Sequence, residues 1–316
     1  MRFKIHLLNI FNSLSDFQPE NKSIVTIGTF DGVHIGHKKI IQKLIQNTLN
    51  NNCQSVVLTF FPHPRMILQH QSDIKLLNTI DEKILLLKNA GLENLIIQKF
   101  DMAFSQLSAE EFVANVLVKQ MNVQKIIIGH DHRFGKNRTA NFEDLVFYGN
   151  KYGFEVEQIS AQEINEVSVS STKIRNAIID GNIKLANGYL GYNYFLSGTI
   201  IRGKQLGRTI GFPTANIQIE ESYKLIPKIG VYIVSSLIDK KLVYGIMNIG
   251  FNPTVDGENF SVEVYFLDFD TDLYDKIICV SVLERIRSEQ KFDSLELLKL
   301  QLEKDKTTCI NYVYGL

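Results

Sequence analysis

The stretch that most constrains the fold lies at residues 23–37, where a buried-strand pattern changes directly into a helix pattern. Residues 23–27 are apolar and rich in β-branched side chains, and residues 38–49 carry apolar residues at helical spacing. Three glycines between them allow tight turns and close approach of a ligand to the backbone. Such a corner directs free N–H groups and the positive end of a helix dipole at one point. The sequence therefore predicts an anion site suited to phosphate.

Two histidines, His34 and His37, lie at the end of this corner. Their imidazoles can add hydrogen bonds or positive charge to a bound anion. Two histidines three residues apart are also compatible with a surface pair or with half of a metal site. The segment Gly-Thr-Phe-Asp-Gly-Val before them follows directly on the predicted strand, and this position favours the anion site.

Length and composition are those of a two-domain globular protein. The chain has 316 residues, 45% of them apolar and 22% charged, with a formal net charge of zero. No basic block indicates nucleic-acid binding. Three scattered cysteines form no disulfide framework, no stretch is apolar enough to span a bilayer, and the N-terminus does not resemble a signal peptide. We therefore expect a cytoplasmic protein with small-molecule partners, no membrane contact and a homo-oligomer as an open possibility.

The first half alternates strand and helix patterns, which favours a parallel, doubly wound sheet. Residues 55–60, 95–97 and 125–128 have strand character, and capping signals at 79–81 and 108–111 predict helices. Two strands end in loops that carry polar groups, Phe-Pro-His-Pro at 61–64 and Gly-His-Asp-His-Arg-Phe-Gly at 129–135. Ligand contacts are typical of such strand ends, and the prolines are expected to stop any helix. A metal site at His130–His132 is disfavoured, because no further His or Cys cluster lies nearby.

The first half closes with Ser-Ser-Thr-Lys-Ile-Arg at residues 170–175. The hydroxyls are expected to cap a helix, but Lys173 and Arg175 in its first turn oppose the helix dipole. A bound anion between these cations would remove that conflict.

From residue 194 onward the pattern is almost entirely β. Six strand-like segments, separated by turns, predict a small closed antiparallel barrel. The predicted domains are 1–186 and 187–316. A final helix from Ser294 is expected to turn Leu295, Leu298 and Leu302 towards the barrel.

The chemical centre of this half is the glycine-rich segment 203–216, which ends in Phe-Pro-Thr-Ala-Asn. It is not a Walker A loop, because no Gly-Lys-Ser/Thr closes it. Further on, Glu263 shares a strand face with Ser261 and Tyr265, and the pattern alone favours a solvated carboxylate on the outside of the barrel.

Taken together, these motifs resemble the bifunctional riboflavin kinase/FAD synthetase family in order and spacing over nearly the whole chain. Gly28-Thr-Phe-Asp-Gly-Val-His-Ile-Gly-His37 resembles the nucleotidylyltransferase signature, and the segments at 61–64, 129–135 and 170–175 resemble further motifs of that domain. The segment 203–216 resembles the riboflavin kinase signature, and Arg-Ser-Glu-Gln-Lys-Phe at 287–292 a segment near its end. His132 and Ala140 depart from the family pattern.

The resemblance implies an α/β fold: an N-terminal Rossmann-like nucleotidylyltransferase domain with a parallel sheet, and a C-terminal antiparallel β-barrel riboflavin kinase domain with a terminal helix. It implies four catalytic residues: His34, His37, Arg175 and Glu263. It implies the nucleotide-binding residues Gly28, Phe30, Asp31, Gly36, Asp131, Ser170, Ser171, Thr172, Gly203, Gly207, Arg208, Gly211, Thr214 and Asn216. It implies the flavin-binding residues Pro62, His63, Pro64, Arg287 and Phe292, although plain structural pairing of Arg287 is an equal alternative.

The implied activity is two successive reactions. The C-terminal domain phosphorylates riboflavin with ATP to FMN, with Glu263 as general base and Mg²⁺ held by Thr214 and Asn216. The N-terminal domain adenylylates FMN with a second ATP, which gives FAD and pyrophosphate. Three alternatives remain: an adenylyltransferase of another substrate, a monofunctional FAD synthetase, and a non-catalytic flavin-binding regulator. Under each of these alternatives, motifs that are intact in this sequence would have no function.

Overall fold

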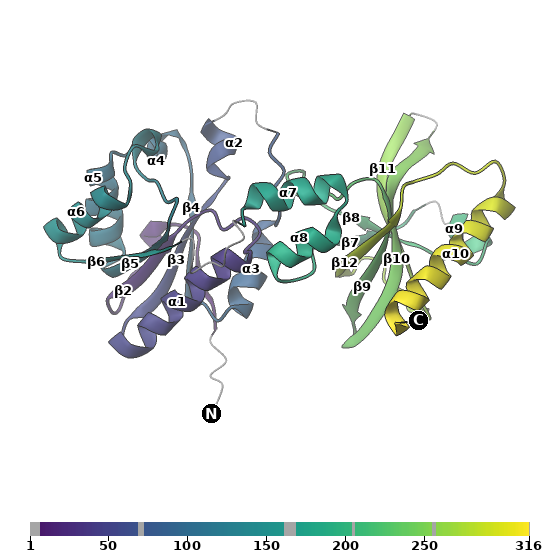
Figure 1. The fold of residues 1–316 in the computed structure, drawn as a ribbon, viewed down its shortest axis with the longest axis horizontal. Helices are drawn as coiled ribbons and strands as arrows, with labels where there is room; N and C mark the ends of the chain where they lie inside the picture. Colours follow the sequence, from purple (N-terminus) through teal and green to yellow (C-terminus); the bar gives the residue numbers. More distant parts are fainter. Residues whose placement is uncertain (1–6, 69–72, 161–168, 204–205, 255–256, 316) are drawn as a thin grey trace. The chain divides into compact units, whose positions relative to one another are not determined.

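The chain folds into two compact units, Met1–Ser171 and Thr172–Leu316, in a computed structural model (Figure 1). The structure describes residues 7–68, 73–160, 169–203, 206–254 and 257–315. The helical segment after residue 171 thus groups with the second unit. The functional boundary after residue 186 stays a prediction, since compactness and function need not divide a chain at the same residue.

The first unit is built on a six-stranded sheet in which every pairing is parallel. The predicted doubly wound α/β architecture is confirmed. In spatial order the strands are β1 (Asn9–Phe11), β4 (Asn94–Lys99), β3 (Gln54–Phe61), β2 (Ser23–Ile27), β5 (Val123–Gly129) and β6 (Glu155–Ile159).

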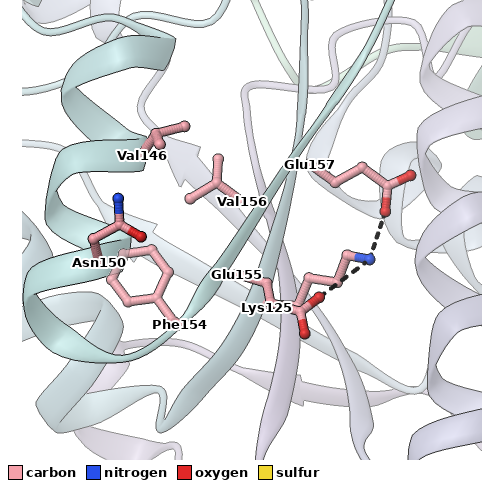
Figure 2. A pocket seen from close by; sticks show the side chains of 7 residues that line it. All are labelled: Lys125, Val146, Asn150, Phe154, Glu155, Val156 and Glu157. Carbon is pink, nitrogen blue, oxygen red and sulfur yellow. Dashed lines mark ion pairs between the residues drawn. The ribbon is translucent and has the colours of Figure 1, made fainter.

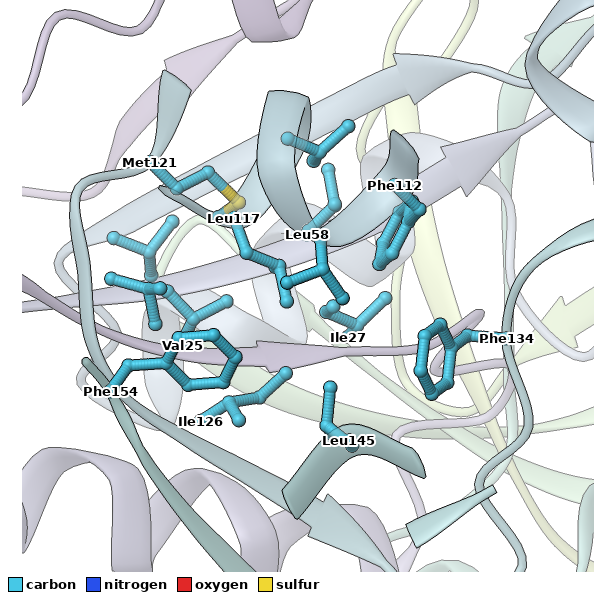
Figure 3. Close-up of a cluster of buried hydrophobic side chains, with 14 of the residues drawn as sticks. Val25, Ile27, Leu58, Phe112, Leu117, Met121, Ile126, Phe134, Leu145 and Phe154 are labelled. Carbon is cyan, nitrogen blue, oxygen red and sulfur yellow. The ribbon is translucent and has the colours of Figure 1, made fainter. Parts of the chain in front are cut away.

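Side chains of the central strands point alternately into two cores, because successive residues of a strand face opposite sides of a sheet. Val25 and Ile27 of β2 join the core beneath η2 (Phe112–Gln120) and α6 (Phe142–Tyr152), which Figure 3 shows. Ile24 faces the other core. A strand buried on both faces needs the continuous apolar run that the sequence has at this position.

The second core lies beneath α1 (Ile35–Asn51) and α3 (Ile80–Asn89). Ser108 and Glu111 form the predicted capping box at α5 (Ala109–Glu111), and Thr79, one of two N-cap candidates, caps α3 in a further box with Glu82. The remaining helices of this unit are short: η1 (Leu14–Asp16), α2 (Pro64–Leu68), α4 (Met102–Ser105) and η3 (Lys136–Arg138).

One expectation for this unit is wrong. The prolines of segment 61–64 were expected to stop any helix, but Pro64 begins α2. Proline suits the first position of a helix, because the N–H that it lacks has no partner within the helix there.

The second unit is a closed barrel with strand order β10-β11-β8-β7-β12-β9, and all its pairings are antiparallel. This confirms the predicted barrel. Its strands are β7 (Phe195–Ile201), β8 (Ala215–Gln218), β9 (Gly230–Ile238), β10 (Lys241–Thr254), β11 (Gly257–Phe266) and β12 (Ile277–Arg287). Its helices are α7 (Ser171–Asp180), α8 (Ile183–Leu190), α9 (Leu206–Thr209) and the terminal α10 (Leu295–Tyr314).

The terminal helix starts as predicted, but its most deeply buried residues are not the predicted leucines. Ser294 caps α10 by accepting from the Leu297 N–H. Of the three leucines expected to face the barrel, Leu298 and Leu302 are half-buried and Leu295 is 63% exposed, whereas Asp305 and Cys309 are fully buried. The most deeply buried residues thus lie in the second half of α10, and one of them is a carboxylate.

Candidate active sites

The first candidate site lies at the point where the strand order of the parallel sheet reverses. From β2 the chain proceeds through β3 to β4 on one side, and β5 and β6 lie on the other. Ligands of open α/β sheets bind beyond the carboxyl ends of the strands at such a switch point. The segment Gly28–His37 follows β2, and segment 129–135 follows β5, so topology brings the two predicted loops to one edge.

The backbone of the corner after β2 is strained. Phe30 and Val33 have φ values of 47° and 36°, and Gly32 has φ 87°. Positive φ is rare outside glycine and disfavoured most for β-branched residues such as Val33. Phe30 and Val33 are both buried, so packing holds the conformation in place. Backbone strain of this kind clusters at ligand-binding sites.

The two histidines of the corner form a stacked pair. Their ring centroids lie 3.6 Å apart, and the His37 ring also packs against Phe30 at 5.0 Å. His34 is the N-cap of α1, and its Nδ1 accepts a hydrogen bond from the His37 N–H at 3.4 Å. The neutral His34 ring therefore carries its proton on Nε2. The buried Nδ1 of His37 has no hydrogen-bond partner within the described part of the chain.

Both histidines are neutral near pH 7. Burial lowers the pKa of His34 to about 4, although Asp31 and Asp131 act in the opposite direction. Burial, with His34 and Lys83 nearby, holds the pKa of His37 well below its usual range. The sequence predicted that these imidazoles add hydrogen bonds or positive charge. Since both rings are neutral, they can add hydrogen bonds.

Asp31 connects the corner to two other segments. It is 2% exposed, and its Oδ1 accepts from the Leu77 N–H at 2.9 Å. Its carbonyl accepts from Ser171 Oγ at 2.8 Å, so the start of the segment 170–175 reaches the histidine corner. Thr172 and Arg175 follow on α7 within the second unit, Thr172 exposed and Arg175 half-buried.

The loop after β3 lies at the same edge of the sheet as the loop after β5, as expected. Pro62, His63 and Pro64 follow β3, the neighbour of β2, and His63 Nδ1 accepts from the Arg65 N–H at 3.1 Å. After β5, a Cβ at Gly129 would meet Asp131 Oδ1 at 3.6 Å, so the Asp131 carboxylate lies over that strand end.

Two residues, His132 and Ala140, depart from the family pattern. His132 stacks on Phe134 with ring centroids 6.2 Å apart, and burial lowers the pKa of His132 to about 4. Ala140 is buried and pairs with Phe134 in an isolated antiparallel bridge.

Sequence reasoning missed a lysine beneath the corner. Lys83 of α3 is 4% exposed, and its Nζ donates to the Thr29 carbonyl at 2.8 Å. Thr59 Oγ1 donates to the same carbonyl at 3.2 Å. No motif marks Lys83, because a lysine on an amphipathic helix usually lies in solvent.

The second candidate site lies in the barrel, where β8 and β11 pair. Glu263 lies opposite Asn216 in the register, and Thr214 precedes β8. Thr214 Oγ1 donates to Glu263 Oε2 at 2.9 Å, and Ser261 Oγ donates to Oε1 at 3.4 Å. Glu263 is therefore half-buried and hydrogen-bonded rather than a freely solvated surface carboxylate.

The glycines of segment 203–216 allow the chain to pack closely around this cluster. A Cβ at Gly203 would lie 2.3 Å from Asn216 Nδ2, so the Asn216 amide rests on the Gly203 backbone. A Cβ at Gly207 would lie 2.2 Å from the Phe212 carbonyl, and Gly211 has φ +86°. Arg208 is exposed within this segment.

Arg287 is held by the terminal helix. Its Nε donates to Asp305 Oδ1 at 3.0 Å, its Nη2 donates to Oδ2 at 2.7 Å, and Gln301 Nε2 donates to Oδ1 at 2.9 Å. The structural pairing that the sequence left open is present. Phe292 is half-buried in the segment between β12 and α10.

A surface hollow beside the edge strand β6 contains none of the predicted site residues (Figure 2). Lys125, one of the residues that line it, makes ion pairs with Glu157 at 2.7 Å and Glu155 at 3.6 Å. Since these charges compensate one another, we assign no ligand to this hollow.

The described residues were also compared with the requirements of a membrane span and of a metal site. Within them, no helix combines the length and apolarity needed to cross a membrane. The same residues contain no group of three or more His, Cys, Asp or Glu side chains placed to hold a metal ion.

Comparison with known proteins matches each unit to a separate enzyme family. The FAD synthetase family model matches residues 16–173, and the riboflavin kinase family model matches residues 190–313. A bifunctional riboflavin kinase/FMN adenylyltransferase of Escherichia coli K12 is 36% identical over 94% of this chain and 95% of its own length. One from Listeria monocytogenes is 38% identical over 90% of both chains.

A solved structure from Streptococcus pneumoniae, named a macrolide-efflux protein, is 33% identical with a TM-score of 0.87. It covers 96% of this chain and 99% of that chain. The likeness thus includes both units. With two family models in series and relatives above 30% identity over nearly the full length, this chain belongs to the bifunctional riboflavin kinase/FMN adenylyltransferase family.

Proposed function

We propose that this protein makes FAD from riboflavin in two steps, each at its own site. The observation that carries the proposal is the presence of two separate polar clusters, the His34–His37 corner in the parallel-sheet unit and the Thr214–Asn216–Glu263 cluster in the barrel. The substrates are riboflavin, FMN and ATP, and FAD is the final product. The proposed location is the cytoplasm, without nucleic acid or membrane as a partner.

In the adenylyl transfer, an oxygen of the FMN phosphate attacks the α-phosphorus of ATP. The new P–O bond forms as the bond to the bridging oxygen breaks, and pyrophosphate leaves with that electron pair. No general base is needed, because an ionised phosphate is already nucleophilic. The neutral imidazoles of His34 and His37 donate hydrogen bonds to the triphosphate, where charge grows in the transition state.

The segment 170–175 supplies the positive charge for the leaving pyrophosphate in this proposal. Ser171 already bonds the carbonyl of Asp31, which supports its place beside the corner. Arg175, four residues after Ser171, is the cation of this segment that is proposed to hold the leaving phosphates. Pro62, His63, Pro64 and Asp131 are proposed to contact the flavin and the nucleotide at the same sheet edge.

In the kinase reaction, Glu263 removes the proton from the ribityl 5′-hydroxyl as its oxygen attacks the γ-phosphorus of ATP, and ADP leaves. The residues fit Mg²⁺: Thr214 offers a hydroxyl oxygen whose own proton is donated to Glu263, and Asn216 beside it offers an amide oxygen. When bound, Mg²⁺ neutralises charge on the phosphates. Gly203, Gly207, Arg208 and Gly211 are proposed to enclose the nucleotide, and Arg287 and Phe292 to border the flavin.

The two-site assignment is tested by one substitution in each unit. His37→Ala is expected to lower FAD formation from FMN by about 10²-fold or more, the loss typical of removing a transition-state hydrogen bond, while riboflavin is still converted to FMN. Glu263→Ala is expected to lose the conversion of riboflavin to FMN, while it still forms FAD when FMN is supplied. Products are separated by chromatography after incubation with ATP and Mg²⁺. His130→Ala, at an exposed position beside the first site, is the matched control. Equal loss of both reactions in either variant would contradict the assignment.

A further inference from the structure

Lys83 is an unusual component of the adenylyl-transfer unit, because its ammonium group is buried beneath the histidine corner. The residue is 4% exposed, and its Nζ makes one hydrogen bond within the described part of the chain, to the Thr29 carbonyl at 2.8 Å. An ammonium group has three donors. Burial of such a group is costly unless a counter-charge and hydrogen bonds compensate for the lost water.

The charges around Lys83 belong to the corner itself. From the loop after β2, Asp31 faces it; from α1, His37 does; and on its own helix Glu82 is bonded to the Thr79 N–H. Burial lowers the pKa of Lys83 to about 8, against the effect of Asp31, so the group is still mainly cationic at pH 7. Both histidines of the corner are neutral there. Lys83 therefore supplies positive charge beneath this corner.

The hydrogen bond of Lys83 also orients a peptide group. Lys83 and Thr59 both donate to the Thr29 carbonyl, so that oxygen points at the sheet and at α3. In a trans peptide the N–H lies opposite the carbonyl. The N–H of Phe30 is therefore turned away from Lys83. Phe30 is one of the strained residues of the corner, with φ 47°.

We propose that Lys83 is a positioning residue for adenylyl transfer, which acts by fixing the Thr29–Phe30 peptide and by placing one positive charge beneath the phosphate-binding corner. This inference rests on the proposed function of the first unit. The role is separate from that of the histidines, which touch the triphosphate, because Lys83 acts through the backbone between them and β2.

The test compares Lys83→Met, which removes the charge at similar length, with Lys83→Arg, which keeps it. Lys83→Met is expected to lower kcat/KM for ATP in FAD formation by about 10²-fold, the size of loss that misplacement of a reacting group produces. Lys83→Arg is expected to keep most of the parental kcat/KM for ATP. The riboflavin kinase reaction of the same proteins is expected to be unchanged. Lys88→Met, exposed in the last turn of the same helix, is the matched control.

The pH profile distinguishes positioning by a charge from a packing effect. In the unmodified protein, kcat/KM for ATP is expected to fall as pH rises through about 8, where Lys83 loses its proton. Lys83→Arg is expected to shift that fall to higher pH, because a guanidinium stays protonated. Of the groups that face Lys83, none other is expected to change charge between pH 7 and 9.

Two results would overturn the inference. One is a Lys83→Met protein that melts like the parent and forms FAD at the parental kcat/KM. The other is a Lys83→Arg protein that is folded, as judged by circular dichroism, but as inactive as Lys83→Met at every pH. If the unmodified protein forms no FAD at all, the proposed function itself fails, and that result is seen before any variant is compared.

Discussion

Burial decides the chemistry of single residues in this protein more than residue type does. His34 is 6% exposed, and the Nδ1 of His37 is buried, so neither imidazole carries a charge at neutral pH. Neutral rings are still good hydrogen-bond donors to phosphate oxygens. Lys83, the buried amine beneath them, keeps its proton at pH 7 and complements them.

A stability measurement checks the charge state of His34. Its pKa is about 4 in the folded protein and 6.5 in the unfolded chain, so between these values the unfolded chain binds the proton and acid favours unfolding. The full pKa difference corresponds to about 3 kcal/mol, lost as pH falls from 6.5 to 4. Urea unfolding of the unmodified protein and of His34→Gln, followed by circular dichroism from pH 7 to 4, measures this loss. An identical pH dependence in both proteins would show that folding leaves the pKa of His34 unshifted.

Gly203 gives a second prediction at this scale. A methyl group there would lie 2.3 Å from Asn216 Nδ2, so Gly203→Ala must displace the Asn216 amide or the loop. We expect riboflavin kinase activity to fall about 10²-fold, because a small misplacement of a binding group has effects of that size. FAD formation from FMN is expected to be unchanged. Gly188→Ala, where a Cβ meets nothing within 4 Å, is the control; a parental kinase rate in Gly203→Ala would contradict the prediction.

Whole elements are attached by a few polar anchors as well as by apolar contact. Helix α10 exposes Leu295, Leu297 and Leu300, and it buries Asp305 against Arg287 of β12. A paired, buried carboxylate of this kind is costly to disrupt from one side, because the remaining charge stays buried without its counter-charge.

Asp305→Ala is therefore expected to destabilise the barrel unit by about 3–5 kcal/mol, with loss of riboflavin kinase activity as α10 detaches. Thermal unfolding and kinase assays measure the two effects. The double variant Arg287→Met/Asp305→Leu is expected to recover most of the stability, since it removes both charges. Glu303→Ala, exposed on the same helix, is the control. A melting temperature for Asp305→Ala that equals that of Glu303→Ala would show that the ion pair contributes little.

At the scale of the whole molecule, the chain contains two units with separate cores, and each carries one of the two reactions in our proposal. FMN is the product of one and the substrate of the other. If FMN passes through solvent, an equimolar mixture of His37→Ala and Glu263→Ala proteins is expected to convert riboflavin to FAD, although neither alone does so. Chromatography of the mixture measures this. Accumulation of FMN without FAD, at FMN concentrations that saturate the Glu263→Ala protein, would contradict it.

The sequence by itself determined the class of each half and the family. The apolar run of β2 favours a strand buried on both faces, and the capping signals at residues 79–81 and 108–111 indicate where helices begin. Such signals are local, so they are readable without the fold. The residue roles at both sites stay predictions. The geometry of the His34–His37 pair and of the Thr214–Glu263 pair supports them.

Only the tertiary structure decided which polar residues are buried and what they contact. Lys83 lies 54 positions from Thr29, and Asp305 lies 18 positions from Arg287. No local pattern distinguishes these from solvated charges, because a side chain's hydration depends on elements that pack over it from distant parts of the chain. The same holds for the neutral histidines, whose charge state follows from burial and not from spacing.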